Sequence, residues 1–261
     1  MIPNVIHYCW FGKNPYPALM KKCLDSWKKH SPNYKFVEWN EDNFDINCNQ
    51  YVKEAYSAKK WAFVTDYVRL YVLYNYGGIY MDTDVEVIKS IDDFLKYPAF
   101  TGFENDSMIP TAIMGAHSHN HWIKLLLDYY NDIHFINPDG TLNLTTNVVT
   151  ITNLTHEAYG IELNNTIQQI DNEFIIFPKS FFCPKSYHTG KISISAETYT
   201  IHHFNGSWQD TSSHQERKRQ IRYRRILGEK LGNRFLQITA MYKRKDGSLK
   251  KAILNYLRRK K

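Results

Sequence analysis

The chain has 261 residues, 43% of them hydrophobic and 15% aromatic, which is enough apolar side chain for the core of one domain with an appendage. No stretch approaches the roughly 18 consecutive apolar residues of a membrane span, and residues 1–7 lack the layout of a signal peptide, so we expect a cytoplasmic location. The net charge of +7 divides into −7 over residues 1–210 and +14 over residues 211–261, an acidic body and a basic tail.

Short apolar runs alternate with helical patterns along the body, which is typical of the α/β class. Residues 5–10 predict a first strand, residues 16–30 a helix with apolar side chains at fourfold spacing, and residues 34–39 a second strand. A turn-rich loop follows the first strand. The carboxyl end of a strand is where α/β sheets usually hold a ligand.

A long helix is predicted from about Ala58 to Tyr76, because apolar side chains recur on one face and Gly77-Gly78 ends the pattern. The strand that follows carries Asp82-Thr83-Asp84 at its far end. Further strands are predicted at 99–103, 111–115, 174–177 and 198–204, and a helix at 121–130. The Asn- and Thr-rich residues 137–172 give no clear pattern.

The sequence becomes helical and basic from about residue 215, so we divide the chain into a catalytic domain, 1–210, and a basic helical C-terminal extension, 211–261. An apolar stripe with basic residues outside it favours contact with an anionic membrane surface, and it is formed by Leu249, Ala252, Ile253, Tyr256 and Leu257. A simpler alternative is a solvated helix that packs on the body. A nucleic-acid partner is not expected, because the positive charge lies outside the body that carries the motifs.

Asp82 and Asp84 stand one residue apart at a strand end, where two carboxylates can converge on a hard divalent cation. Such a cation can bridge the phosphates of a nucleotide donor. The motif alone is weak, since 15 aspartates in 261 residues produce about one Asp-x-Asp by chance. Four scattered cysteines without a Cys-x-x-Cys pair indicate neither a zinc site nor a disulfide framework.

Asp66 and Arg69 precede this motif on the long helix, three residues apart, and can therefore share a face. One interpretation is a surface ion pair of little energetic consequence. The other is a partly enclosed pair beside the Asp82-Thr83-Asp84 triplet, where it could hydrogen-bond the vicinal hydroxyls of a sugar.

Three ordered blocks together resemble the sugar-binding-region DXD glycosyltransferases, a glycosyltransferase family 32-like group. They are Ile2 to Gly12, the stretch from Ala62 to Arg69 with Gly77 to Val85, and His202 to Trp208. The group includes bacterial capsule and O-antigen transferases, the yeast initiating mannosyltransferase and the catalytic domain of clostridial glucosylating toxins. The resemblance covers residues 1–210.

The resemblance implies a GT-A fold and a retaining hexosyltransferase that uses a UDP-sugar with Mn²⁺ or Mg²⁺. It implies a glycan acceptor, possibly linked to undecaprenyl diphosphate, in capsule or O-antigen synthesis at the inner face of the cell membrane. By motif position Trp10 stacks on the base, Tyr80 lines the nucleoside site, and Asp66 and Arg69 hold the donor sugar. Asp82 lies near the ribose and the metal, and Asp84 binds the metal.

The closing block carries a histidine where the toxin-like pattern has an acidic ligand, and that position is His203. Histidine is a sound ligand for Mn²⁺, so we predict His203 as the third ligand. Its neighbour His202 points to the opposite face of a strand, so one of the two faces the site. Trp208, with its indole N–H, is predicted to reach the β-phosphate.

Two other functions fit part of these signals. Asp-x-Asp after an apolar strand also occurs in haloacid-dehalogenase-like phosphatases, but Glu86 stands where that pattern needs a threonine and no later acidic pair follows a strand. The basic tail by itself fits a nucleic-acid-binding or membrane-binding module.

Overall fold

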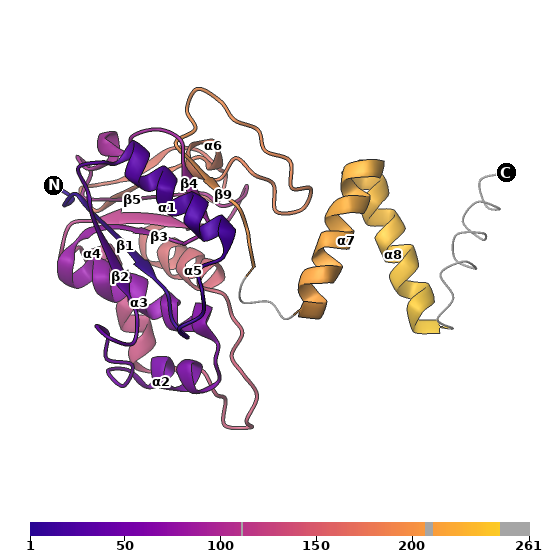
Figure 1. Cartoon of the computed structure of the whole chain (residues 1–261), viewed down its shortest axis with the longest axis horizontal. Coiled ribbons are helices and arrows are strands. Elements are labelled where there is room, and N and C mark those ends of the chain that lie inside the picture. Colours follow the sequence, from indigo (N-terminus) through magenta and orange to yellow (C-terminus); the bar gives the residue numbers. More distant parts are fainter. Residues whose placement is uncertain (111, 207–210, 246–261) are drawn as a thin grey trace. The chain divides into compact units, whose positions relative to one another are not determined.

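The computed structural model describes residues 1–110, 112–206 and 211–245 (Figure 1). The chain separates into two compact units. Of the described residues, the first unit holds 1–110, 112–185 and 193–206, and the second holds 186–192 and 211–245.

The first unit is built on a seven-stranded mixed sheet. Its strands follow the order β2 (Lys35–Trp39), β1 (Val5–Cys9), β3 (Gly78–Met81), β6 (Ile113–Ala116), β5 (Ala99–Gly102), β8 (Phe174–Phe177) and β7 (Gln168–Ile170). β1 lies parallel to β2 and β3, and β5 lies parallel to β8, whereas β6 and β7 run antiparallel to their neighbours. The mixed sheet confirms the predicted α/β class and is consistent with a GT-A fold.

Each face of the sheet carries its own hydrophobic core. One core packs against α2 (Gln50–Ser57), α3 (Trp61–Tyr76), α4 (His121–Asp128) and α5 (Asn147–Tyr159). The other packs against α1 (Ala18–His30), α6 (Lys179–Phe182) and a two-stranded antiparallel sheet of β4 (Val85–Val87) and β9 (Thr200–His202). Successive side chains of a strand point to opposite faces of the sheet, so each strand contributes to both cores. In β3, Tyr80 faces the first core, and Ile79 and Met81 face the second.

The long helix α3 begins at Trp61 and not at the predicted Ala58. Ala58 instead ends α2, a helix that the sequence did not reveal, and the backbone turns at Lys59 with a φ of 56°. The side chain of Asn49 starts α2 by accepting a hydrogen bond from the Val52 amide. Helix α5 and strand β7 occupy the segment for which no pattern was found.

Two glycines turn the end of α3 directly into β3. Gly77 and Gly78 have φ values of 65° and 112°, a region that other residues rarely adopt. A Cβ on Gly78 would also lie 2.7 Å from the Val5 carbonyl oxygen of β1. The turn therefore sets β3 tightly beside β1 and brings residues that follow β3 close to the start of α3.

The second unit is a helical hairpin of α7 (Thr211–Leu227) and α8 (Glu229–Lys245), joined at Gly228. The rings of Tyr223 and Phe235 lie 4.9 Å apart between the helices. A Cβ on Gly232 would lie 2.7 Å from the Arg224 Cα, so this glycine permits the close approach. The predicted apolar stripe from Leu249 to Leu257 lies outside the described residues. Within the described part of the chain, no helix is long and apolar enough to cross a membrane.

Candidate active site

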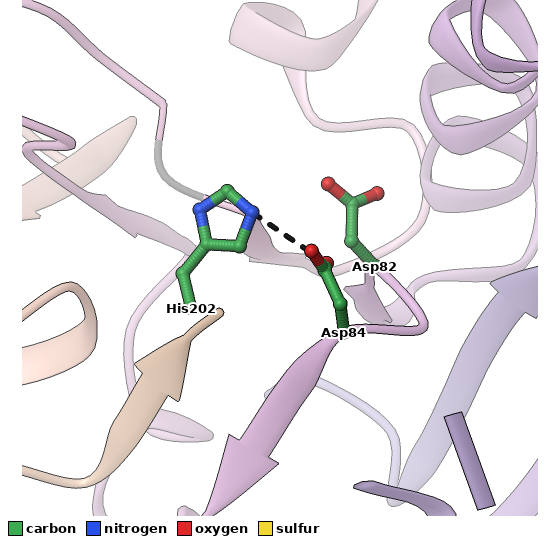
Figure 2. Close-up of side chains that lie close together, drawn as sticks. All are labelled: Asp82, Asp84 and His202. Atoms are coloured by element: carbon green, nitrogen blue, oxygen red, sulfur yellow. Dashed lines mark ion pairs between the residues drawn. The ribbon is translucent and has the colours of Figure 1, made fainter. Parts of the chain in front are cut away.

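Asp82, Asp84 and His202 come together at the ends of three strands (Figure 2). One ligand atom from each lies within 4.8 Å of the other two. Asp82 follows β3, and Asp84 lies in the turn that leads into β4, closed by a hydrogen bond of 3.0 Å from the Val85 amide to the Asp82 carbonyl oxygen. Pairing of Val85 with His202 between β4 and β9 adds the imidazole.

His202, and not the predicted His203, joins the two aspartates. The Nε2 atom of His203 lies 2.8 Å from the Glu86 carboxylate, which also accepts a hydrogen bond of 2.7 Å from Lys22. Consecutive residues of an extended strand point to opposite faces, so only one of the two histidines reaches the cluster. The register in which β9 pairs with β4 places His202, and not His203, at the cluster.

The Asp84 carboxylate is held on both oxygens. Its Oδ1 lies 3.5 Å from the His202 Nε2, and its Oδ2 accepts a hydrogen bond of 2.7 Å from the Asn205 amide. Burial alone would raise the pKa of Asp84, but His202 and the amide outweigh it and lower this pKa to about 2. Burial opposes the charge of His202, yet Asp84 raises the pKa of the imidazole well above its ordinary value. Asp84 therefore stays ionised at neutral pH.

Arg69 connects this cluster to helix α3. Its Nη2 lies 3.2 Å from one carboxylate oxygen of Asp66 and 3.2 Å from one of Asp82. Burial raises the pKa of Asp66 to about 7, with Arg69 opposing the rise and Asp82 adding to it. Burial works against the Arg69 charge as well, but Asp82 and Asp66 raise its pKa and keep it a cation. The pair is enclosed beside Asp82, with side-chain exposures of 6% for Arg69 and 9% for Asp66.

The structure places two of the three aromatic residues predicted to bind the donor. Tyr80 is only 2% exposed, and its ring lies under the Arg69 guanidinium at 4.7 Å, so it supports Arg69 and has no open face for a nucleoside. Trp10 follows β1, is partly exposed and donates its indole N–H to the Asn14 carbonyl oxygen at 2.7 Å. Trp208 lies outside the described residues.

Sequence reasoning missed two residues that adjoin His202. The Glu104 carboxylate lies 3.9 Å from the His202 Nδ1, and the buried thiol of Cys183 interacts with the same ring. Glu104 follows β5, so the rule that ligands gather at strand ends was a usable signal. No sequence pattern pointed to Cys183, because it meets His202 only through the folded sheet.

The donor set fits a hard or borderline divalent cation. Two carboxylates favour Mg²⁺ or Mn²⁺, and an imidazole is acceptable to Mn²⁺. The side chains of Asp82 and Asp84 are 27% and 16% exposed, so the cluster is reached from solvent. Asp82, Asp84 and His202 are therefore the residues that would hold such an ion.

Residues 17–101, which run from before α1 into β5, match the family model described as "Glycosyltransferase sugar-binding region containing DXD motif". Over these residues, about a third of its length, the chain is similar to that family. The match includes Asp66, Arg69, Asp82 and Asp84, and the Asp-Thr-Asp triplet is its DXD motif.

The chain is also similar to curated proteins. Inositol phosphoceramide mannosyltransferase 3 of Schizosaccharomyces pombe is 31% identical over 126 residues, 44% of this chain and 33% of that protein. Inositol phosphoceramide mannosyltransferase 2 of the same yeast is 25% identical over 199 residues, 72% of this chain and 56% of that protein. The chain thus spans between a third and somewhat over half of these relatives.

Among solved structures, the PaToxG glycosyltransferase is similar with a TM-score of 0.46 and 19% identity, covering 60% of this chain and 68% of that one. At this score and identity the likeness is a distant one.

Proposed function

We propose that the protein is a glycosyltransferase that moves a hexose from a nucleoside diphosphate sugar to a hydroxyl group of an acceptor. The observation that carries this proposal is the convergence of Asp82, Asp84 and His202 within 4.8 Å, at the DXD motif of a matched sugar-binding region. The chemistry needs a site where negative charge on a departing nucleoside diphosphate is stabilised.

Different residues of the site have different roles in this reaction. Asp82, Asp84 and His202 would hold a Mn²⁺ or Mg²⁺ ion, which would supply positive charge against the donor diphosphate. Arg69 keeps Asp82 in place and adds a fixed cation to the site. Asp66 orients Arg69 and, with it, is the proposed contact for the hydroxyl groups of the donor sugar.

Two kinds of similarity suggest the identity of the donor and the acceptor. The resemblance at residues 1–210 favours a UDP-hexose, whereas the names of the yeast relatives favour a mannosyl group and an inositol phosphoceramide acceptor. Capsule or O-antigen synthesis and retention of anomeric configuration stay predictions from the sequence. A lipid-linked acceptor is common to both sources, and we propose this class, reached from the cytoplasmic side of a membrane.

Release of nucleoside diphosphate tests the reaction directly. The chain is incubated with UDP-glucose, UDP-galactose, UDP-N-acetylglucosamine and GDP-mannose, with Mn²⁺ or with a chelator. We expect Mn²⁺-dependent release from one donor, and loss of about 100-fold in Asp84→Asn, since a ligand of the ion is removed. His203→Asn is the matched control, because this histidine faces Glu86 and not the cluster. Absence of metal-dependent release from any donor would end the proposal.

The product also reports the stereochemistry. Proton NMR of the glycoside formed by the active donor gives its anomeric configuration. Retention supports the predicted mechanism, and inversion removes that part of the proposal while leaving sugar transfer intact.

Membrane attachment is tested with the full chain. Arg222 and Arg225 are exposed on α7, and each basic residue near anionic lipid contributes about 1 kcal/mol. We expect Arg222→Glu with Arg225→Glu to weaken binding to phosphatidylserine vesicles by at least about 30-fold. Equal binding to anionic and neutral vesicles would remove the membrane role.

A further inference from the structure

The imidazole of His202 presents its two nitrogens to two different carboxylates. Figure 2 shows Nε2 directed at Asp84, with Nδ1 on the other side of the ring. The nearest carboxylate on that side is Glu104, whose Oε2 lies 3.9 Å from Nδ1. His202 thus stands between an acidic residue of the DXD motif and an acidic residue at the end of β5.

The Nδ1 atom is buried and makes no hydrogen bond of good geometry within the described part of the chain. A buried polar atom left without a hydrogen bond destabilises the folded state. The Glu104 side chain is 20% exposed, so solvent reaches part of it. A movement of about 1 Å would bring its carboxylate to hydrogen-bond distance.

A cation bound to His202 would favour a hydrogen bond between Nδ1 and Glu104. An imidazole that binds a cation through Nε2 must carry its proton on Nδ1, and a carboxylate that accepts this proton fixes both the tautomer and the ring orientation. Cys183 is the other group beside the ring, but a thiol is a weak acceptor compared with a carboxylate.

We infer that Glu104 is a positioning residue for the cation: its carboxylate accepts the Nδ1 proton of His202 and so commits Nε2 to the ion shared with Asp82 and Asp84. This inference rests on the proposed function, because it requires that the cluster bind a divalent cation. It adds a residue beyond the region matched by the family model, which ends at residue 101.

Calorimetric titration of the full chain with Mn²⁺ tests the inference without turnover. We expect Glu104→Ala to weaken Mn²⁺ binding by about 10- to 100-fold, the usual effect of losing such a partner. Glu104→Gln should weaken it less, because the amide oxygen still accepts the proton. Glu173→Ala is the matched control, since Glu173 faces the exposed His121 at 3.1 Å and should leave the affinity unchanged.

The titration separates the two proposals. Suppose that the wild-type chain binds Mn²⁺, that Asp84→Asn weakens this binding, and that the affinity of Glu104→Ala stays within about threefold of wild type. The role of Glu104 is then refuted, and the metal site stands. If the wild-type chain binds neither Mn²⁺ nor Mg²⁺, the metal site falls and the inference falls with it.

The tautomer of His202 provides a second readout that folding defects of a variant do not affect. In ¹⁵N-histidine-labelled wild-type protein saturated with Mg²⁺, we expect His202 to carry its proton on Nδ1. A proton on Nε2 in this state would overturn the inference, even if Glu104→Ala proves too unstable to titrate.

Discussion

Arg69 is shared between two carboxylates that reach it from different elements. Asp66 comes from the preceding turn of α3 and Asp82 from the end of β3, each at 3.2 Å. The i, i+3 spacing and the position of the triplet after Gly77-Gly78 made this neighbourhood predictable from the sequence. The choice between His202 and His203 was not, because it depends on the registration of two strands more than a hundred residues apart.

Removal of the Arg69 charge should leave the buried Asp66 carboxylate facing the partly exposed carboxylate of Asp82. We expect Arg69→Met to lower the free energy of unfolding by about 3 kcal/mol, the range found when one partner of a buried ion pair is lost. Urea denaturation followed by circular dichroism measures this change. A second change, Asp66→Asn in the Arg69→Met background, should recover part of the loss, and no recovery would contradict the assigned coupling.

Elements with strong apolar patterns were predicted well, and those held by distant contacts were not. β8 has the predicted bounds, Phe174–Phe177, because a short apolar run between turns is too short for a helix and is buried most easily as a strand. α5 is rich in Thr and Val, which suit strands better than helices, yet it forms a helix whose Ile151 packs into the core. α2 is short, and one of its side chains anchors it to a distant loop.

That anchor is Glu54 of α2. Its carboxylate accepts hydrogen bonds of 2.8 and 2.9 Å from the amides of Phe135 and Ile136, and it lies 2.8 Å from the His134 ring. Burial alone would raise the pKa of Glu54, but these contacts outweigh it and lower the pKa to about 2. The carboxylate therefore ties the loop before α5 to α2.

Glu54→Gln should destabilise the protein by about 2 kcal/mol at pH 7, because a charged acceptor is lost. Since the folded pKa lies below the unfolded one, this contribution is complete above about pH 5. It is lost as the pH falls toward 2. Urea denaturation of both proteins at pH 7 and pH 3.5 measures the difference, and a gap that widens at low pH would contradict the assignment.

Strand β6 depends on a glycine for a different reason. A Cβ on Gly115 would lie 2.7 Å from the Cδ1 of Phe100, whose ring covers it from β5. We expect Gly115→Ala to cost about 2 kcal/mol through overpacking. Phe100→Leu in the same chain should relieve part of this cost, and additive losses in the double variant would show that the ring is not the cause.

At the scale of the whole molecule, the chain consists of two compact units that differ in chemistry. The first carries the DXD motif and both hydrophobic cores, and the second is a basic helical hairpin. Charge alone indicated this division, since residues 211–261 hold 17 Lys and Arg against 3 Asp and Glu. Composition did not show that residues 186–192 belong with the hairpin, where the Arg217 guanidinium lies 4.1 Å from the Tyr187 ring.

A change inside the hairpin should leave the first unit intact. Gly232→Val places a branched side chain against the Arg224 backbone and should open α7 from α8, increasing tryptic cleavage between them by several-fold. The Mn²⁺ affinity should stay within about twofold of wild type. Leu231→Ala, at an exposed position of the same helix, is the control, and a large loss of Mn²⁺ affinity in Gly232→Val would refute the separation.

The pairing of β4 with β9 also determines at what stage of synthesis the cluster can form. Asp84 precedes β4, while the groups that hold its carboxylate, His202 and the Asn205 amide, are made more than a hundred residues later. A nascent chain that has completed the whole DXD region therefore has the motif without the cluster. Until the final strand of the first unit has emerged from the ribosome and paired, the growing polypeptide lacks the imidazole and the amide that complete this cluster.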